Sequence, residues 1–141
     1  MEKGDWVSYW LLKSEPDEFG WPHLIAAGAS EWTGIRNYQA RNNLRSMAVG
    51  DLAFFYHSNI GKAIVGIAEI TKTAGPDSTT DDPRWNSVWL RPLRPLTPVT
   101  LETCKTTAGL ADMALVKSPR LSVQPVSPTE WAIICALGES I

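Results

Sequence analysis

The segment from residue 32 to residue 44 concentrates side chains that recognise nucleic acids. It reads Trp-Thr-Gly-Ile-Arg-Asn-Tyr-Gln-Ala-Arg-Asn-Asn-Leu, with aromatic, guanidinium and amide groups and no carboxylate. Guanidinium groups suit phosphates and base edges, amides bind base edges, and aromatic rings stack on bases. The segment therefore indicates either a nucleic-acid interface or a helix with a polar, solvated face whose Trp anchors its start in the core.

Polar residues also follow two apolar runs at the points where those runs end. Lys13-Ser14-Glu15 follows the first run, and Tyr56-His57-Ser58-Asn59 closes another. Strand ends converge at the mouth of a barrel, where a few polar groups frame a pocket with aromatic walls. Of the seven Trp residues, Trp32 and Trp85 lie in or beside predicted loops. We expect Trp32 to be a pocket wall rather than a core residue, and for Trp85 both interpretations stay open.

Composition narrows the class of protein. The chain has 141 residues, of which 44% are hydrophobic, so we expect one domain over residues 1–141 with a flexible N-terminus at residues 1–7. No apolar run approaches the roughly 18 residues of a membrane helix. The first six residues, Met-Glu-Lys-Gly-Asp-Trp, lack the apolar stretch of a secretory signal, which favours a cytoplasmic protein.

The chain has few residues that could bind a metal ion or act in catalysis. The two cysteines, Cys104 and Cys135, and the two histidines, His23 and His57, are scattered along the chain. Motifs of nucleotide-binding loops, serine hydrolases and zinc proteases are missing. Glu15 and Asp17 flank a proline, where a turn role is more common than acid–base chemistry. We expect no metal, no cofactor and no enzymatic activity.

Charge is unevenly distributed. The net charge of −2 argues against binding nucleic acid through bulk positive charge. Between residues 32 and 68, however, the sequence has four basic residues, Arg36, Arg41, Arg45 and Lys62, and only one acid, Asp51. A local basic face of this kind implies few phosphate contacts and a shallow salt dependence.

The spacing of apolar and turn residues predicts a mixed α+β domain. Strands are expected at 8–13, 51–57, 62–73, 85–93 and 121–126, and helices at 21–27, 38–47, 100–107 and 128–137. The prolines from residue 92 to residue 98 place strand 85–93 at a sheet edge. Gly66 indicates a bulge that lets the sheet curl. We expect an incompletely closed, mostly antiparallel β-barrel of five or six strands with three or four helices.

Helix 38–47 is predicted to have two different sides. Asn37 is a suitable N-cap for it. One side consists of Ala40, Leu44 and Met47, and the other of Tyr38, Arg41, Asn42 and Arg45. We expect the first side to pack, and we predict that Arg41 and Arg45 bind phosphates. The alternative is that these two arginines pair with acids such as Glu31 or Asp51.

Six sequence blocks resemble the EVE domain family. They are residues 9–16, 32–44, 54–59, 64–69, 83–85 and 120–126, and they occur in family order. The resemblance implies a PUA-like barrel, a fold group that includes YTH readers of methylated adenine in RNA and SRA readers of modified cytosine in DNA. It also implies a reader of modified bases with an aromatic pocket. The loop before Pro83-Arg-Trp85 is shorter than in many family members.

Carried over by position, the resemblance implies a specific base pocket. Its residues are Lys13, Ser14, Glu15, Trp32, Arg36, Asn37, Tyr38, His57, Trp85, Ser122 and Gln124. The expected protein is a non-enzymatic monomer that reads a modified base, above all a modified cytosine in DNA, flipped into the pocket. Modified RNA remains an alternative ligand, and so does a free nucleobase, nucleoside or similar heterocycle.

Overall fold

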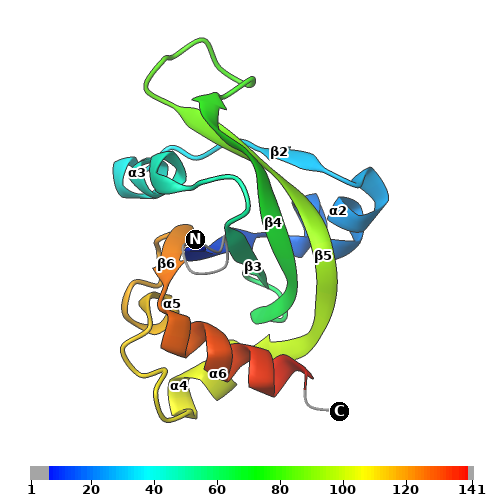
Figure 1. Cartoon of the computed structure of the whole chain (residues 1–141), viewed down its shortest axis with the longest axis vertical. Coiled ribbons are helices and arrows are strands. Elements are labelled where there is room, and N and C mark those ends of the chain that lie inside the picture. Colours follow the sequence, from blue (N-terminus) through cyan, green and yellow to red (C-terminus); the bar gives the residue numbers. More distant parts are fainter. Residues whose placement is uncertain (1–6, 140–141) are drawn as a thin grey trace.

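The structure, a computed structural model, describes residues 7–139 and contains a curved six-stranded sheet (Figure 1). The strands are β1 (Tyr9–Ser14), β2 (Ser30–Trp32), β3 (Leu52–His57), β4 (Ala63–Pro76), β5 (Asn86–Thr100) and β6 (Val123–Val126), in the order β2-β5-β4-β3-β1-β6. Only the β1–β3 pair is parallel. The predicted α+β class and mostly antiparallel sheet are confirmed. Because β2 and β6 are free edges, the predicted closure toward a barrel is not observed in the described residues.

Six helical segments complete the described chain. They are α1 (Pro16–Phe19), α2 (Trp21–Ala27), α3 (Tyr38–Ser46), α4 (Leu101–Thr106), α5 (Ala114–Lys117) and α6 (Pro128–Glu139). The three or four predicted helices correspond to α2, α3, α4 and α6. The expected number is too low because α1 and α5 have four residues each, too few to show a helical period.

Helices cover both faces of the sheet. Side chains alternate along β3, so Phe55 packs with the residues of α2 and α3, whereas Phe54 packs toward α6. The Phe54 ring stacks on Trp131 with centroids 3.8 Å apart. A sheet buried on both faces has strands that are apolar throughout, which explains why β1 and β3 read as continuous apolar runs.

The long strands β4 and β5 bend sharply across the molecule (Figure 1). Phe55 pairs with Gly66 but Tyr56 pairs with Ile64, which confirms the predicted bulge. A Cβ atom at Gly66 would lie 2.6 Å from the ring of Trp21. Glycine therefore lets α2 approach the sheet at the bend.

Two strand predictions need correction. Strand β5 lies between β2 and β4 rather than at an edge, and it extends to Thr100. Its prolines are tolerated because β2 pairs only with Val88–Leu90, so the later part of β5 is open on one side. The three-residue strand β2 was not predicted at all.

The predicted N-cap of α3 is confirmed. The Asn37 side chain accepts a hydrogen bond from the Ala40 backbone N–H, 2.9 Å away, as an N-cap does. The predicted flexible segment at residues 1–7 lies, apart from Val7, outside the described residues. Between residues 7 and 139, none of the helices has the length and apolar character needed to cross a membrane.

Candidate nucleic-acid interface

A cavity of about 570 Å³ opens where β1 ends and β2 begins. Its walls come from residues 13–15, 18–19 and 30–35, together with Ser58 and Ser122. The parallel pairing of β1 with β3 sets Ser14 beside His57, and the Ser58 N–H donates to the Ser14 carbonyl at 2.9 Å. The predicted convergence of polar strand ends is therefore present. The volume lies within the roughly 300–1,000 Å³ of small-ligand sites.

Trp32 belongs to both the cavity wall and the hydrophobic core. Its side chain is only 6% exposed, and it packs edge to face on Phe55 and Phe19, with ring centroids 5.5 Å and 6.3 Å apart. It also lines the cavity. The expected location in a loop is wrong, because Trp32 ends strand β2 and pairs with Val88 of β5.

The polar rim is held by hydrogen bonds to neighbouring segments. The Lys13 ammonium donates to the Pro119 carbonyl at 2.7 Å, and burial lowers the pKa of Lys13. The Ser14 hydroxyl donates to the Phe19 carbonyl at 2.6 Å. The Glu15 carboxylate accepts a hydrogen bond from the Asn59 amide.

The structure divides the expected base pocket into two sets. Lys13, Ser14, Glu15, Trp32 and Ser122 line the cavity, whereas Arg36, Asn37, Tyr38, His57, Trp85 and Gln124 do not. Several unpredicted residues also contribute to the wall: Glu18, Phe19, Ser30, Glu31, Thr33, Gly34, Ile35 and Ser58.

Two of the outlying residues are engaged elsewhere in the fold. Gln124 is fully buried, and its amide N–H donates to the carbonyls of Leu121 and Ser118 at 2.9 and 3.1 Å. Gln124 pairs with Leu11 of β1, whose side chain packs on the same face of the sheet as Phe54 and α6. The Gln124 amide therefore supports α5 and the turn that follows it. His57 Nε2 accepts from the Trp21 backbone N–H at 3.0 Å, and burial lowers the pKa of His57. The ring therefore anchors α2.

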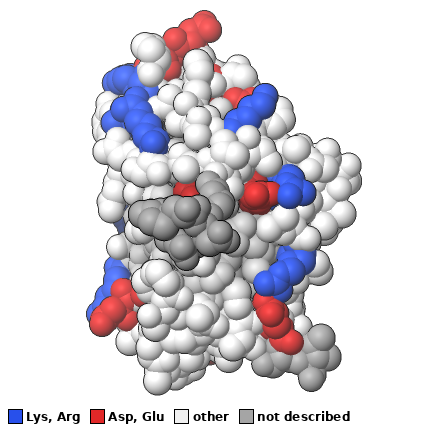
Figure 2. Space-filling model, in the orientation of Figure 1, with Lys and Arg blue, Asp and Glu red and all other residues white. Residues whose placement is uncertain are grey.

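Another group forms an arginine–aromatic surface, defined here as Arg36, Tyr38, Arg41, Arg45, Arg84 and Trp85. The rings of Tyr38 and Trp85 stack with centroids 5.2 Å apart, and the guanidinium of Arg41 lies 4.9 Å from the Tyr38 centroid. Figure 2 shows basic side chains gathered at the upper left, in the region of α3 and the β4–β5 loop. Trp85 is thus part of a surface stack and not a cavity wall.

Arg41 and Arg45 carry charge that no described carboxylate neutralises. Arg41 donates to the Arg84 carbonyl at 3.2 Å, and Arg45 Nε donates to the Asn86 side-chain oxygen at 2.6 Å. Between residues 7 and 139 neither arginine forms an ion pair. The alternative of pairing with Glu31 or Asp51 is therefore wrong.

Those two acids have other partners. Glu31 accepts hydrogen bonds from the hydroxyls of Ser78 and Ser87, at 2.5 and 2.7 Å, and the Ser78 bond is the main cause of its lowered pKa. Asp51 accepts from the indole N–H of Trp10 at 3.0 Å.

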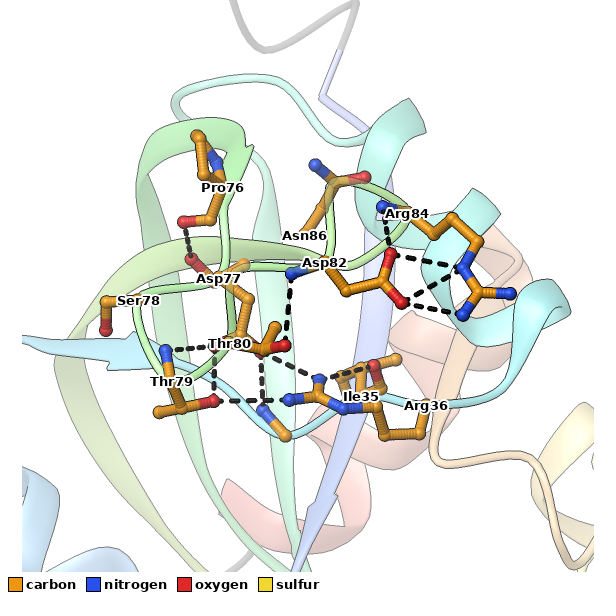
Figure 3. Close-up of polar contacts among 12 residues, drawn as sticks. Ile35, Arg36, Pro76, Asp77, Ser78, Thr79, Thr80, Asp82, Arg84 and Asn86 are labelled. Carbon is orange, nitrogen blue, oxygen red and sulfur yellow. Dashed lines mark hydrogen bonds and ion pairs between the residues drawn. The ribbon is translucent and has the colours of Figure 1, made fainter.

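A buried carboxylate fixes the β4–β5 loop beside the cavity (Figure 3). Asp77 accepts from the Gly34 N–H at 2.9 Å, from Arg36 at 3.0 Å and from both donors of Thr79. Burial alone raises the pKa of Asp77, but these hydrogen bonds outweigh it and lower the value to about 2. Because Gly34 lines the cavity, Asp77 joins the cavity to the arginine–aromatic surface.

Sequence reasoning missed Asp77, Glu31 and Arg84. Arg84 lies beside Trp85 in a block of the family resemblance, so its position gave a signal. Asp77 lies in a loop rich in Gly, Pro, Asp and Thr, and its partners Gly34 and Arg36 are far along the chain, so no local pattern identifies it. Within residues 7–139 no three His, Cys, Asp or Glu side chains cluster in a way that would hold a metal ion.

The fold and the cavity define a small α+β protein with an aromatic-walled site beside two arginines that have no carboxylate partner among residues 7–139. The EVE domain family matches residues 8–137, so this chain belongs to the EVE domain family. Mouse thymocyte nuclear protein 1 is 38% identical over 94% of this chain and 74% of its own length.

Two solved structures extend the likeness to three dimensions. A protein from Agrobacterium tumefaciens has a TM-score of 0.92 and 47% identity, with 94% of each chain covered. The human THYN1 protein, solved in complex with 5-methylcytosine-containing DNA, has a TM-score of 0.89 and 34% identity over 96% of this chain and 99% of that chain.

Proposed function

We propose that this chain is a non-enzymatic reader of a modified base and that its preferred ligand is a modified cytosine in DNA. The observation that carries the proposal is its likeness, over 96% of its length, to the human THYN1 protein in complex with 5-methylcytosine-containing DNA. The aromatic-walled cavity and the adjacent arginines supply a physical basis for the same kind of recognition.

The cavity suits a base that has left its stack. Extruding a base costs a few kcal/mol, and stacking on an aromatic side chain returns roughly 1–3 kcal/mol. Trp32 and Phe19 are the aromatic rings in the wall. A methyl group on the base adds about 0.8 kcal/mol of apolar contact, so discrimination against plain cytosine should be modest.

We assign the polar rim to the base edge. Carboxylates accept from the amino group of cytosine, and hydroxyls bond to donors or acceptors. Glu15 is thereby assigned to the amino group, with Ser14 and Ser122 at the remaining edge atoms. Lys13 sits at the rim, where the base joins its sugar and phosphate.

The residues outside the cavity receive a different assignment. Arg41 and Arg45 contact phosphates, because no carboxylate of the described chain pairs with their positive charges. The stacked rings of Tyr38 and Trp85, with Arg36 beside them, contact nucleotides that flank the extruded base. We assign no ligand contact to Gln124 or His57.

The test is a titration of oligonucleotides that differ only in one base: cytosine, 5-methylcytosine or 5-hydroxymethylcytosine, with adenine and N6-methyladenine as a second pair. We expect about a fourfold preference for the methylated cytosine, which corresponds to about 0.8 kcal/mol. An RNA series with the same bases separates DNA from RNA recognition. Equal affinity across the whole panel would refute the proposal.

A sensor of a free nucleoside is the competing function, since a cavity of about 570 Å³ accommodates a base without a strand. Competition between 5-methyl-2′-deoxycytidine and the methylated oligonucleotide distinguishes the two functions. The sensor is favoured if the nucleoside binds as tightly as the oligonucleotide and if Arg41→Gln with Arg45→Gln has no effect.

A further inference from the structure

A second hollow adjoins the base cavity and brings two lysines together. Its volume is about 240 Å³, and it shares Lys13 and Ser58 with the cavity. Asn59 and Lys62, from the turn between β3 and β4, complete its polar wall. The two spaces therefore meet at Lys13 and Ser58.

Positive charge in this hollow is not neutralised by the described protein. Neither Lys13 nor Lys62 forms an ion pair within residues 7–139. The half-buried ammonium of Lys13 donates to the Pro119 carbonyl, at 2.7 Å, and has further protons to donate. The nearby Glu15 carboxylate does not line the hollow, and it is engaged by the Asn59 amide.

The turn that carries Lys62 is fixed in position. The Lys62 carbonyl accepts a hydrogen bond from the Leu101 N–H at 2.8 Å, which ties the turn to the start of α4. Lys62 itself adopts a φ of 31°, and Asn59 a φ of 66°. The exposed Lys62 side chain is therefore carried by an anchored backbone at the edge of the hollow.

We propose that this hollow binds a phosphate of the nucleotide whose base enters the cavity. The inference rests on the proposed function, because it places the phosphate next to the bound base. Lysine ammonium groups bind phosphate as point charges, and the Ser58 hydroxyl and Asn59 amide add neutral donors. Lys13 lines both spaces, so it contacts the base side and the phosphate side of the same nucleotide.

This phosphate site is separate from Arg41 and Arg45. Those arginines bond to the β4–β5 loop, which meets the cavity at Glu31 and Gly34. The lysine hollow meets the cavity at Lys13 and Ser58. One consequence is that a nucleotide should bind more tightly than its nucleoside even without a neighbouring strand.

Isothermal titration calorimetry with three probes tests the inference: 5-methyl-2′-deoxycytidine, its 3′-monophosphate and its 5′-monophosphate. We expect the wild-type chain to bind one of the monophosphates about fivefold more tightly than the nucleoside, the size of a partly exposed charge contact. Lys62→Gln should remove most of this preference and leave nucleoside affinity unchanged. In oligonucleotide binding, Lys62→Gln should lower the salt slope by about 0.7–0.9.

Lys72→Gln is the matched control. Lys72 lies within β4, the strand that follows the turn carrying Lys62, and its ammonium is over the Trp89 ring. Lys72 is ten positions further along the chain than Lys62, a contour length on the order of 30 Å for extended backbone. Both variants lose one positive charge, so only the local effect of Lys62 differs. We expect Lys72→Gln to keep the monophosphate preference and the wild-type salt slope.

The failure of this inference can be told apart from the failure of the proposed function. If wild type prefers the methylated oligonucleotide but Lys62→Gln keeps the salt slope and the monophosphate preference, the phosphate site is wrong and the reader function stands. If wild type shows no preference for a modified base, the reader function fails. Plain oligonucleotides then still test Lys62, and an unchanged slope overturns the phosphate site as well.

Discussion

Trp32 lies where the cavity wall and the core are the same structure, so its removal should affect both. The ring is 6% exposed and packs edge to face on Phe19 and Phe55. Truncating a buried aromatic to alanine costs about 3–5 kcal/mol, against a total stability of about 5–15 kcal/mol for a domain. We therefore expect Trp32→Ala to lose base recognition together with a large part of its free energy of unfolding.

Urea denaturation followed by circular dichroism measures the stability loss. With a slope of about 1–3 kcal/mol per molar urea, a loss of 3 kcal/mol lowers the midpoint by about 1–3 M. Trp32→Phe keeps one aromatic ring in the wall, and it should retain most of the stability while weakening oligonucleotide binding. Trp85→Ala is the control, because Trp85 is outside the cavity and stacks on Tyr38 at the surface.

A free energy of unfolding for Trp32→Ala within about 0.5 kcal/mol of wild type, the size of an ordinary surface change, would contradict a structural role for the ring. That result would mean that the Trp32 ring contacts the ligand but contributes little to the free energy of unfolding. Wild-type affinity in Trp32→Phe, combined with lost discrimination between methylated and plain cytosine in Trp85→Ala, would instead place the base against the arginine–aromatic surface.

Three further variants test other parts of the site. Arg41→Gln combined with Arg45→Gln should weaken binding to methylated and plain strands by the same factor and lower the salt slope by about 1.4–1.8; an unchanged slope would remove both arginines from the phosphate contacts. Asp77 has a pKa lowered from 3.8 to about 2, so its contribution of about 2 kcal/mol is present above pH 3.8 and lost as the pH falls toward 2. Denaturation across this range should show a pH dependence about 2 kcal/mol larger in wild type than in Asp77→Asn, because the other acids titrate in both proteins; equal pH dependences would contradict it. Gln124→Leu removes the side-chain donor to the Leu121 carbonyl and one of the two donors to the Ser118 carbonyl, which should lower stability by about 1–3 kcal/mol. Base discrimination should persist in this variant; its loss in a normally stable protein would return Gln124 to the site.

Helix α3 could be predicted from the sequence because its determinants are local. The Asn37 cap, the packed stripe of Ala40 and Leu44, and the exposed Tyr38 all lie within one short segment, and the structure has them as expected. Caps and periodic apolar spacing act between near neighbours. Local signals of this kind can be recognised in a single sequence.

Strand β2 could not be predicted in the same way. Its three residues acquire their strand conformation by pairing with Val88–Leu90 of β5, far along the chain. Three residues are too few for an alternating pattern. Trp32 therefore read as a loop residue, although the pairing buries it against Phe55.

Sequence reasoning placed all the predicted base-pocket residues in one site, whereas the structure places some in the cavity and others in the arginine–aromatic surface or elsewhere in the fold. Pairing β1 with β3 and β6 brings Lys13, Ser14 and Ser122 to one cavity, and strand ends are visible in the sequence. The grouping of Tyr38 with Trp85 depends on how the β4–β5 loop folds back onto α3. That loop is positioned by Asp77 and Glu31, whose partners no local pattern identifies.

In a chain of net charge −2, the acids of the β4–β5 loop neutralise two arginines of the arginine–aromatic surface and fix them in place. Asp77 pairs with Arg36 and Asp82 pairs with Arg84, which holds both guanidinium groups about 5.7 Å from the Trp85 ring centroid.

Among the cations of the cavity, the adjoining hollow and the arginine–aromatic surface, four lack an ion pair within residues 7–139 and are left for phosphates: Lys13, Arg41, Arg45 and Lys62. Four contacts give a salt slope of about −3 to −4 on a strand. A general nucleic-acid binder that neutralises many phosphates would give a much steeper slope. A slope beyond about −6 would show that the paired arginines also exchange their carboxylates for phosphates, and that the loop reorganises on binding.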